Sequence, residues 1–321
     1  MSINTDNYIC PETGQKLQLN SGKLVSNSGA TWEIDNRNIP NFLDEQGIGA
    51  EDKASLDWYK VNAIDYDQYL PLTFETFDVD EDQERQKMID ALEIKQGDTI
   101  LEIGAGTGRD TEKLLSSLQN GEIFIQDISS EILSICYDKL STSHVDVEKS
   151  FFISNASNLP LPDNKFDRVF HFGGLNTFSN RKEAIREIIR VAKPGAKVVI
   201  GDENMPVWLR NTEFGQVLMN SNPHYSYEIP FVDLPIEARN VKVEWIIGGV
   251  FYFITFDVAE SAPKANIDFE IPGVRGGTHR TRFYGQLEGV GEKNKTRIYN
   301  YARENKTSVS AVLEQLISSL D

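Results

Sequence analysis

A glycine-rich turn directly after a short apolar run is the feature that most constrains the fold of this chain. Residues 99–103 (TILEI) form the apolar run, and residues 104–108 (GAGTG) form the turn. Glycine lets the backbone turn sharply and come close to a ligand. A stretch with Leu114, Leu115 and Leu118 at helical spacing follows. Strand, glycine turn and helix in this order are typical of the first unit of a doubly wound α/β sheet.

The same alternation of short apolar runs and helical segments continues along the chain. Further strands are predicted at residues 122–127, 150–153, 166–172 and 196–200. The helix at residues 183–191 is expected to end in a turn at residues 193–195 (KPG). This alternation predicts βαβ units, and hence a Rossmann-like parallel sheet with helices on both faces. The runs 241–246 and 250–256, separated by IGG, predict a β-hairpin at the sheet edge.

Changes in composition along the chain predict four segments. Residues 1–45 hold short strands broken by Gly, Asn and Ser, which indicates a small β-rich module, and residues 46–95 are acidic and helical. The sheet-forming core covers residues 96–260, with a large insert at about 204–240. Residues 261–321 form a C-terminal extension that ends in a helix, with Ser308 as its cap.

Charge and cysteine content limit the class of protein. The chain carries 32 Lys and Arg against 49 Asp and Glu, a net charge of -17. An acidic field repels phosphate backbones, so nucleic acid is disfavoured as a partner. Cys10 and Cys136 lie far apart, and the sequence has neither a secretion signal nor an apolar run of ~18 residues. These features predict a cytoplasmic protein with free thiols and no membrane span. Cys136 shares a helix face with Ile132 and Leu133, which favours the core over a nucleophilic role.

Two acidic residues near the glycine turn indicate what the turn binds. Glu102 precedes the first glycine by two residues, and the spacing is G-x-G-x-G instead of the G-x-G-x-x-G of a dinucleotide site. An acid at that place suits an ammonium group better than a pyrophosphate. Asp127 ends the second strand about twenty residues later, where a carboxylate takes ribose hydroxyls. A nucleoside joined to an amino acid, without a diphosphate, describes S-adenosylmethionine (SAM).

Three motifs in order make the chain resemble the class I SAM-dependent methyltransferases. They are residues 101–108 (LEIGAGTG), residues 155–167 (NASNLPLPDNKFD) and residues 190–195 (RVAKPG). The second is similar to the family pattern D-A-x-x-L-P-F-x-x-x-x-F-D, and the third is similar to R-V-L-K-P-G-G. The resemblance covers about residues 60 to 205 and implies SAM as the cofactor and methyl transfer as the activity.

The resemblance also implies a role for single residues. Gly104, Ala105 and Gly106 would pass beneath the methionine part of SAM, Glu102 would orient the loop or the ammonium, and Asp127 would hold the ribose. Asn155 stands where the family pattern has Asp, and its amide can both donate to and accept from adenine. The other residues implied to contact or cover the cofactor are Ile128, Ala156, Phe172, Tyr66 and Tyr69.

Methyl transfer from a sulfonium is an in-line displacement, so the protein mainly has to align the two reactants. A general base is needed only when the acceptor is protonated at the working pH. His171 is the candidate base, because it ends the fourth strand at the edge where doubly wound sheets bind ligands, and because its ordinary pKa suits the role. The alternative is that His171 only packs or caps at that place.

Two groups of residues are candidates for holding the acceptor. Aromatic residues of the insert could line a pocket or belong to the core; they are Trp208, Phe214, Tyr225, Tyr227 and Phe231. The tail is locally basic around Arg275, His279, Arg280 and Arg282. These side chains could capture a carboxylate or phosphate of the substrate, or they could pair with the protein's own surplus carboxylates.

The N-terminal segment resembles small Trm112-like or zinc-ribbon-derived modules through residues 10–14 (CPETG) and 39–43 (IPNFL). A structural zinc site needs about four Cys or His ligands, and this segment has Cys10 alone. We therefore expect no metal here, and we expect Cys10 to be a small buried apolar residue in a packing or interaction module.

Three functions remain open from the sequence. The first is methyl transfer to a small molecule, at O, N or C; residues 172–176 (FGGLN) are loosely similar to the corresponding segment of ubiquinone and menaquinone C-methyltransferases. The second is RNA methylation, against which the missing zinc ligands and the acidic charge weigh. The third is a SAM-binding scaffold without catalysis. The apolar face of the last helix, with Val309 and Val312, would pack on its own domain or form a homodimer.

Overall fold

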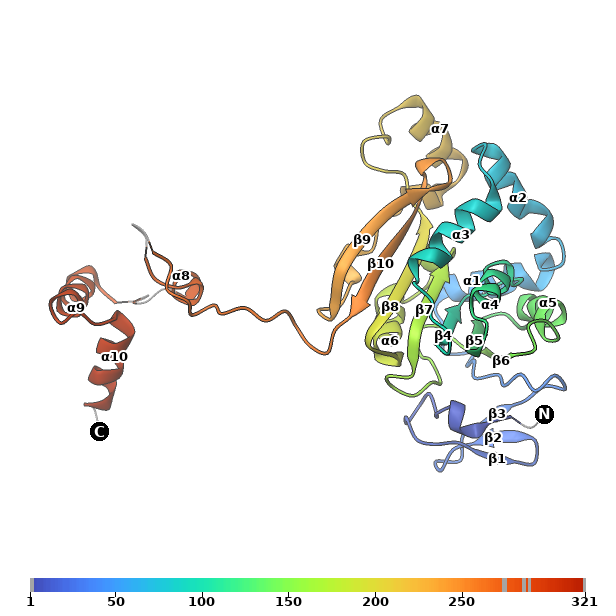
Figure 1. Cartoon of the computed structure of the whole chain (residues 1–321), viewed down its shortest axis with the longest axis horizontal. Coiled ribbons are helices and arrows are strands. Elements are labelled where there is room, and N and C mark those ends of the chain that lie inside the picture. Colours follow the sequence, from blue (N-terminus) through green and yellow to red (C-terminus); the bar gives the residue numbers. More distant parts are fainter. Residues whose placement is uncertain (1–2, 273–275, 285–286, 288–289, 320–321) are drawn as a thin grey trace. The chain divides into compact units, whose positions relative to one another are not determined.

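The computed structural model describes residues 3–272, 276–284, 287 and 290–319. The chain divides into two compact units, Met1–Ala262 and Pro263–Asp321 (Figure 1). Among the described residues, no helix is both long enough and apolar enough to cross a membrane.

A seven-stranded sheet forms the centre of the first unit, in the order β6-β5-β4-β7-β8-β10-β9 (Figure 1). The strands are β4 (Thr99–Ile103), β5 (Gly121–Asp127), β6 (Val147–Ile153), β7 (Phe166–Phe172), β8 (Ala192–Glu203), β9 (Ala238–Ile246) and β10 (Phe251–Val258). The strands β6, β5, β4, β7 and β8 are parallel to one another. The hairpin of β9 and β10 joins antiparallel to β8. This confirms the predicted doubly wound α/β sheet with a C-terminal hairpin.

Each face of the sheet has its own apolar core, because alternate residues of a strand point to opposite faces. On β4, Leu101 and Ile103 belong to one core and Ile100 to the other. The first core lies under α6 (Arg181–Val191). The second lies under α4 (Arg109–Ser117) and α5 (Ser130–Leu140), where Cys136 is fully buried. The strands are apolar on both faces because helices cover both.

Helices from two other parts of the chain complete the first unit. Before the sheet, the chain forms α1 (Ala50–Asn62), α2 (Tyr66–Thr76) and α3 (Glu81–Ala91). The insert forms α7 (Glu213–Ser221) and several single turns.

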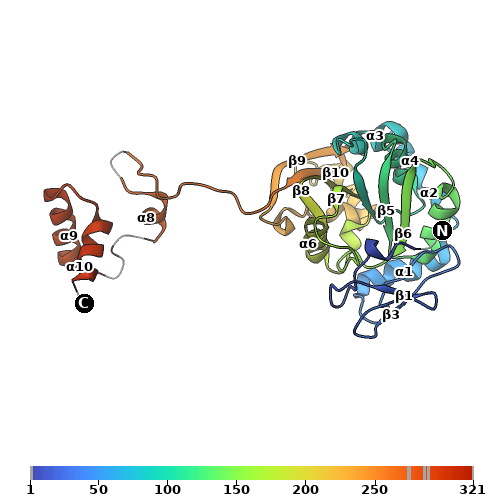
Figure 2. The ribbon, with the colours of Figure 1, turned by 60° about the horizontal axis from the view of Figure 1, so that its bottom comes forward.

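The N-terminal residues form a three-stranded antiparallel sheet that packs on the first core (Figure 2). Its strands are β1 (Gln18–Asn20), β2 (Lys23–Val25) and β3 (Thr31–Glu33). The Tyr8 ring lies 5.7 Å from the Phe152 ring of β6. Phe42 donates its backbone N–H to the Ile153 carbonyl, which lies on edge strand β6. The N-terminal module therefore contacts the main sheet through both side chains and backbone. Cys10 is buried in the core that the two share.

The prediction of a turn at residues 193–195 is wrong. Helix α6 ends at Val191, and strand β8 begins at once, with Ala192 paired to Phe166. The register then shifts before Lys197 pairs with Arg168, and Gly195 takes a φ of +86°. The Pro-Gly pair thus forms an irregularity inside the strand, because pairing on both sides of it holds the backbone extended.

The second unit is small and helical. It contains α8 (His279–Tyr284), α9 (Glu292–Glu304) and α10 (Val309–Ser318). Its described core consists of Leu287, Ala302, Val309 and Val312. Ser308 caps α10 as predicted, because its Oγ accepts the backbone N–H of Ala311 at 3.1 Å.

Candidate active site

A pocket lies at the carboxyl edge of the parallel strands, and all of its lining residues belong to the first unit. The sheet contributes Gly104 after β4, Asp127 at the end of β5, Asn155 after β6, His171 on β7 and Glu203 on β8. The helices before the sheet contribute a second wall, with Asp52, Ser55, Tyr59, Tyr66, Leu70, Thr73, Phe74 and Arg85. The pocket thus lies between the sheet edge and the segment 50–91.

The glycine turn takes backbone angles that other residues rarely adopt. Gly104, Gly106 and Gly108 have φ values of +65°, +58° and +87°. A Cβ on Gly108 would lie 2.7 Å from the Cys136 sulfur, so this glycine lets α4 pack against α5. A Cβ on Gly106 would meet only the Ile132 Cδ1 at 3.9 Å, so the backbone there borders open pocket space. The turn therefore offers a cradle that a side chain would fill.

Asp127 is buried beside this cradle with its carboxylate held by backbone. Its Oδ2 accepts the Gly106 N–H at 2.9 Å, and its Oδ1 accepts the Ser129 N–H at 2.9 Å. Burial raises the pKa of the carboxyl to about 6, against the opposing effect of these hydrogen bonds. Each oxygen keeps a further lone pair, so an ionised Asp127 can also accept hydrogen bonds from two neighbouring hydroxyls.

Glu102 lies beneath the pocket instead of lining it. Its carboxyl is buried and accepts the Thr111 hydroxyl at 2.6 Å, and burial raises its pKa well above the ordinary value. Gln126 takes the place beside the turn that the sequence assigned to Glu102. Its Oε1 accepts the Gly104 N–H at 3.1 Å, and it lines the pocket. The sequence signal for Gln126 is its position directly before Asp127, at the carboxyl end of a strand.

Asn155 lines the pocket and joins the sheet edge to α1. Its Nδ2 donates to Asp52 Oδ2 at 2.9 Å, and its Oδ1 accepts the Ser157 N–H at 2.8 Å. Asp52 also accepts the Ser179 N–H at 3.1 Å. Ile128 and Ala156 line the same part of the pocket. Asp52 was missed from the sequence because nothing local links it to a residue about a hundred positions away.

Helix α2 covers the pocket with one of its faces. Tyr66, Leu70 and Thr73 share that face, since they are spaced by four and three residues. Tyr69 lies on another face and is 58% exposed, so it does not line the pocket.

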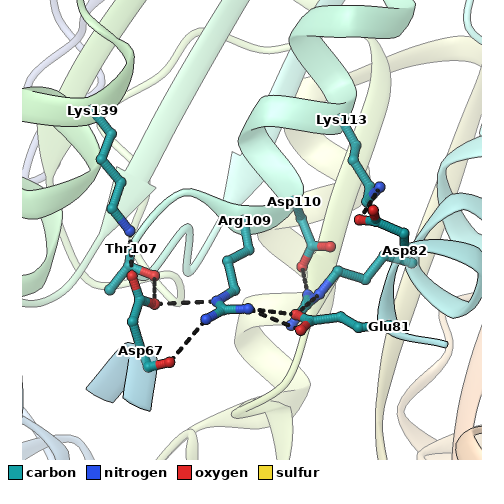
Figure 3. Close-up of polar contacts among 9 residues, drawn as sticks. Asp67, Glu81, Asp82, Thr107, Arg109, Asp110, Lys113 and Lys139 are labelled. Carbon is teal, nitrogen blue, oxygen red and sulfur yellow. Dashed lines mark hydrogen bonds and ion pairs between the residues drawn. The ribbon is translucent and has the colours of Figure 1, made fainter. Parts of the chain in front are cut away.

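A polar network ties α2 and α3 to the glycine turn (Figure 3). Asp67 accepts hydrogen bonds from Thr107 Oγ1, Lys139 Nζ and Arg109 Nε, the last at 3.1 Å. Arg109 also donates to Glu81 Oε1 at 2.8 Å. In this view Arg109 lies between Asp67 and Glu81. A second arginine extends the network, since Arg85 donates to Glu81 at 2.7 Å and to Asp110 at 2.7 Å.

His171 lines the pocket as a neutral imidazole with one free nitrogen. Its Nδ1 lies 2.8 Å from the Ile103 carbonyl oxygen, so Nδ1 carries the proton and donates it. Nε2 is then a bare lone pair, and it is buried without a partner among the described residues. Burial lowers the pKa of the ring. The ring nitrogen that can accept a proton is therefore Nε2.

The aromatic residues of the insert are not among the lining residues of the pocket. Trp208 is exposed and packs edge-on against Trp245 at 5.2 Å. Tyr225 is buried and contacts the Phe251 ring at 5.9 Å. Phe251 and Phe172 do line the pocket, and their rings lie 6.0 Å apart.

The basic residues of the tail belong to the second unit. Arg280 forms an ion pair with Asp268 at 2.7 Å, and Arg282 donates to the Gly276 carbonyl at 2.9 Å. His279 begins α8. Arg275 lies outside the described residues.

Comparison with known proteins shows which family the residues around the pocket resemble. Residues 100–195 match the family described as a methyltransferase domain. That range holds the glycine turn, Asp127, Asn155 and His171. Residues 100–195 are therefore similar to a methyltransferase domain.

Two relatives show how far the likeness extends. The ubiquinone/menaquinone biosynthesis C-methyltransferase UbiE of Pseudomonas paraeruginosa (strain DSM 24068 / PA7) is 36% identical over 115 residues, which is 35% of this chain and 44% of that protein. The protein of the same name from Pasteurella multocida (strain Pm70) is 28% identical over 152 residues, which is 43% of this chain and 57% of that protein. The chain therefore spans about half the length of the curated relatives it matches.

Solved structures show weaker likeness. A SAM-dependent methyltransferase from Aquifex aeolicus is 22% identical with a TM-score of 0.41, covering 59% of this chain and 98% of that one. A chain from the complex of the Haloferax volcanii Trm112 methyltransferase activator with a methyltransferase is 12% identical with a TM-score of 0.49, covering 65% of this chain and 99% of that one.

Proposed function

We propose that this chain is an enzyme that moves a methyl group from SAM to a small-molecule acceptor. The observation that carries the proposal is the convergence of the glycine cradle, Asp127 and His171 on one pocket, within residues that match a methyltransferase domain. The residues present fit SAM, because the cradle at Gly106 has room and Asp127 keeps lone pairs for the ribose hydroxyls. When bound, SAM supplies an electrophilic methyl group on its sulfonium.

The chain's own residues would bind, orient and exclude water. Asp127 would hold the ribose, and Ile128 with Asn155 and Ala156 would flank the adenine. Tyr66 on α2 would close over the cofactor, and alignment of the two reactants would supply most of the rate gain. His171 Nε2 would accept a proton from an acceptor that carries one at neutral pH.

Three observations favour a small acceptor. The helical segment 50–91 forms one wall of the pocket, which leaves room for a small molecule more readily than for an RNA helix. The net charge of -17 also disfavours phosphate backbones. The relatives are named for their part in ubiquinone and menaquinone biosynthesis, which are small molecules.

Calorimetric titration with SAM and with S-adenosylhomocysteine tests the cofactor site. We expect wild-type protein to bind both, and Asp127→Ala to weaken binding by roughly tenfold or more, since it removes hydrogen bonds to a charged group. Asp57→Ala, on the exposed side of α1, is the matched control and should bind as wild type does. If the wild-type protein bound neither ligand, the proposal would be refuted. A scaffold without catalysis would then be the remaining function.

A further inference from the structure

The half of the pocket away from the nucleoside residues is where an acceptor must bind, if the proposed function holds. Asp127 and Asn155 lie at the ends of β5 and β6. On the other side of β4 come β7, β8 and β10. These strands present His171, Glu203 and Phe251 to the pocket. The chemistry of this half therefore indicates the class of acceptor.

Its polar groups are hydrogen-bond acceptors. His171 offers the bare Nε2, which is buried and unpartnered among the described residues. Glu203 lines the pocket, and its carboxylate lies beside a second acid, Asp202, which shares a hydrogen bond with it. Asp202 is fully buried and is held by the backbone N–H groups of Asn176 and Glu203. Burial raises the pKa of Asp202, and the hydrogen bond means that the two acids share a proton, so the pair keeps a single negative charge that a cationic ligand can neutralise.

The cationic side chains of the pocket wall have partners of their own. Arg85 donates to Glu81 and Asp110, both at 2.7 Å. Arg109 donates to Asp67 at 3.1 Å and to Glu81 at 2.8 Å. The positive charge of both guanidinium groups is thus balanced by acids of α2, α3 and α4. Among the described residues, neither Asp202 nor Glu203 forms an ion pair with these arginines.

Aromatic rings stand near these acids. Tyr59 and Tyr66 line the pocket with their rings 5.8 Å apart and nearly perpendicular. Burial raises the pKa of both hydroxyls, and negative charges add to the rise, from Asp127 more than Asp202 at Tyr59 and from Glu203 more than Asp127 at Tyr66. Electron-rich ring faces beside a carboxylate are a favourable setting for an ammonium group.

We propose that the methyl acceptor is a small molecule with a basic amine, which Glu203 and His171 bind and whose nitrogen becomes methylated. The ammonium form gives one N–H proton to His171 Nε2 while Glu203 holds a remaining N–H. The freed nitrogen lone pair then forms the new N–C bond with the SAM methyl, and the C–S bonding electrons stay on sulfur. The products are the methylated ammonium, S-adenosylhomocysteine and a protonated His171. This deepens the proposed function and rests on it.

The family match leaves this acceptor open. Tyr59, Tyr66 and Glu203 lie outside the matched residues 100–195. The relatives are named as C-methyltransferases, but they share about a third to two fifths of this chain's length with it. The match covers His171, but it does not cover the other residues of the acceptor half, Glu203, Tyr59 and Tyr66.

Matched amine and alcohol probes test the inference. Phenethylamine and 2-phenylethanol differ only in the reacting group, and propylamine with 1-propanol, and aniline with phenol, form further pairs. Binding to the protein with S-adenosylhomocysteine present and methyl transfer from SAM are measured for each pair. We expect at least one amine to bind and be methylated at nitrogen, and its alcohol partner to do neither.

Glu203→Gln separates the acceptor site from the cofactor site. The substitution keeps the shape and removes a charge beside Asp202, so the fold should be at least as stable. We expect the amine KM to rise by roughly tenfold or more, as for a lost charge-assisted hydrogen bond, while the SAM Kd stays unchanged. Glu244→Gln on exposed edge strand β9 is the control and should change neither. His171→Gln should lower kcat and remove the fall in rate that protonation of His171 causes at low pH.

Three outcomes would overturn the inference. One is binding or turnover of the alcohols without any preference for amines. Another is that no amine of the panel binds although SAM does. The last is that Glu203→Gln weakens SAM as much as the amine, which would assign Glu203 to the cofactor's own ammonium. Failure of the wild-type protein to bind SAM would instead refute the proposed function itself.

Discussion

At the scale of single residues, Asp127 couples the cofactor site to pH. Its carboxyl is 5% exposed, and burial raises its pKa to about 6. The ionised form accepts the Gly106 N–H and keeps lone pairs for two hydroxyls, whereas the protonated form has lost part of that capacity. Bound ribose hydroxyls would therefore favour ionisation and lower this pKa.

We predict that SAM affinity falls as the pH drops through about 6. The ligand prefers the ionised carboxylate, so each pH unit well below this pKa should weaken binding by up to about tenfold. Titration calorimetry at several pH values between ~5 and ~8 measures the effect. Asp127→Asn is the control, because it cannot ionise. If the variant keeps the same pH dependence, another group is responsible.

At the scale of elements, α2 is held against the glycine turn by Asp67. Burial raises the pKa of this carboxyl, but the hydrogen bonds from Lys139, Thr107 and Arg109 outweigh it and lower the pKa below the ordinary value. A lowered pKa means that the folded state prefers the ionised form. The contribution to stability is therefore present above the unfolded pKa and is lost as the pH falls below it.

We predict that Asp67→Asn loosens α2 without unfolding the domain. Hydrogen bonds to charged groups contribute ~1.5–3 kcal/mol, so amide exchange in residues 66–76 should quicken by roughly tenfold or more. SAM affinity should fall in parallel, because Tyr66 and Leu70 lie on the same helix. Hydrogen exchange with mass spectrometry measures the first effect. Asp57→Asn on α1, which pairs with Lys60 at the surface, should change neither.

The N-terminal module belongs to the main core through aromatic packing. The Tyr8 ring lies 5.3 Å from Phe42 and 5.7 Å from Phe152, and Tyr8 is 3% exposed. We predict that Tyr8→Ala lowers the free energy of unfolding of the first unit by ~3–5 kcal/mol, as for other large aromatic truncations. Urea unfolding measures it. Leu19→Ala on exposed β1 should cost less than ~0.5 kcal/mol. A separate early transition of the module alone would contradict the prediction.

At the scale of the whole molecule, the two units are joined by an accessible segment. Residues 260–270 are all exposed, and Lys264 lies among them. Residues of the first unit alone line the pocket. The cofactor site should therefore be independent of the second unit.

We predict that limited trypsin digestion cuts first after Lys264 and that the large fragment binds SAM as the full chain does. Exposed backbone without packing is the preferred site of proteolytic cleavage. Mass spectrometry identifies the fragment, and calorimetry measures its SAM affinity. Loss of binding by a folded fragment would instead show that the second unit, with His279, Arg280 or Arg282, contributes to the site.

The class of fold could be predicted from the sequence because its signals are local. Apolar runs of strand length, and glycines that must take positive φ, depend on a few neighbouring residues. Asp127 and the glycine turn could be predicted as pocket residues for the same reason, since both directly end strands of one sheet. The β-hairpin could be predicted because two apolar runs and the short turn between them are enough to indicate it.

Tertiary structure alone decided which side chains meet in the pocket. Asp52, Arg85 and Glu203 come from distant parts of the chain, and no spacing along the sequence links them. The family resemblance implied that Tyr66 and Tyr69 both cover the cofactor, but the packing of α2 turned Tyr66 inward and left Tyr69 in solvent. Burial and partner groups likewise set the charge states of Glu102, Asp127 and His171. The sequence by itself determined the sheet and the position of the cofactor loop, because those depend on local backbone preference. The chemistry of the pocket depended on long-range contacts, because only packing fixes burial, direction and electrostatic neighbours.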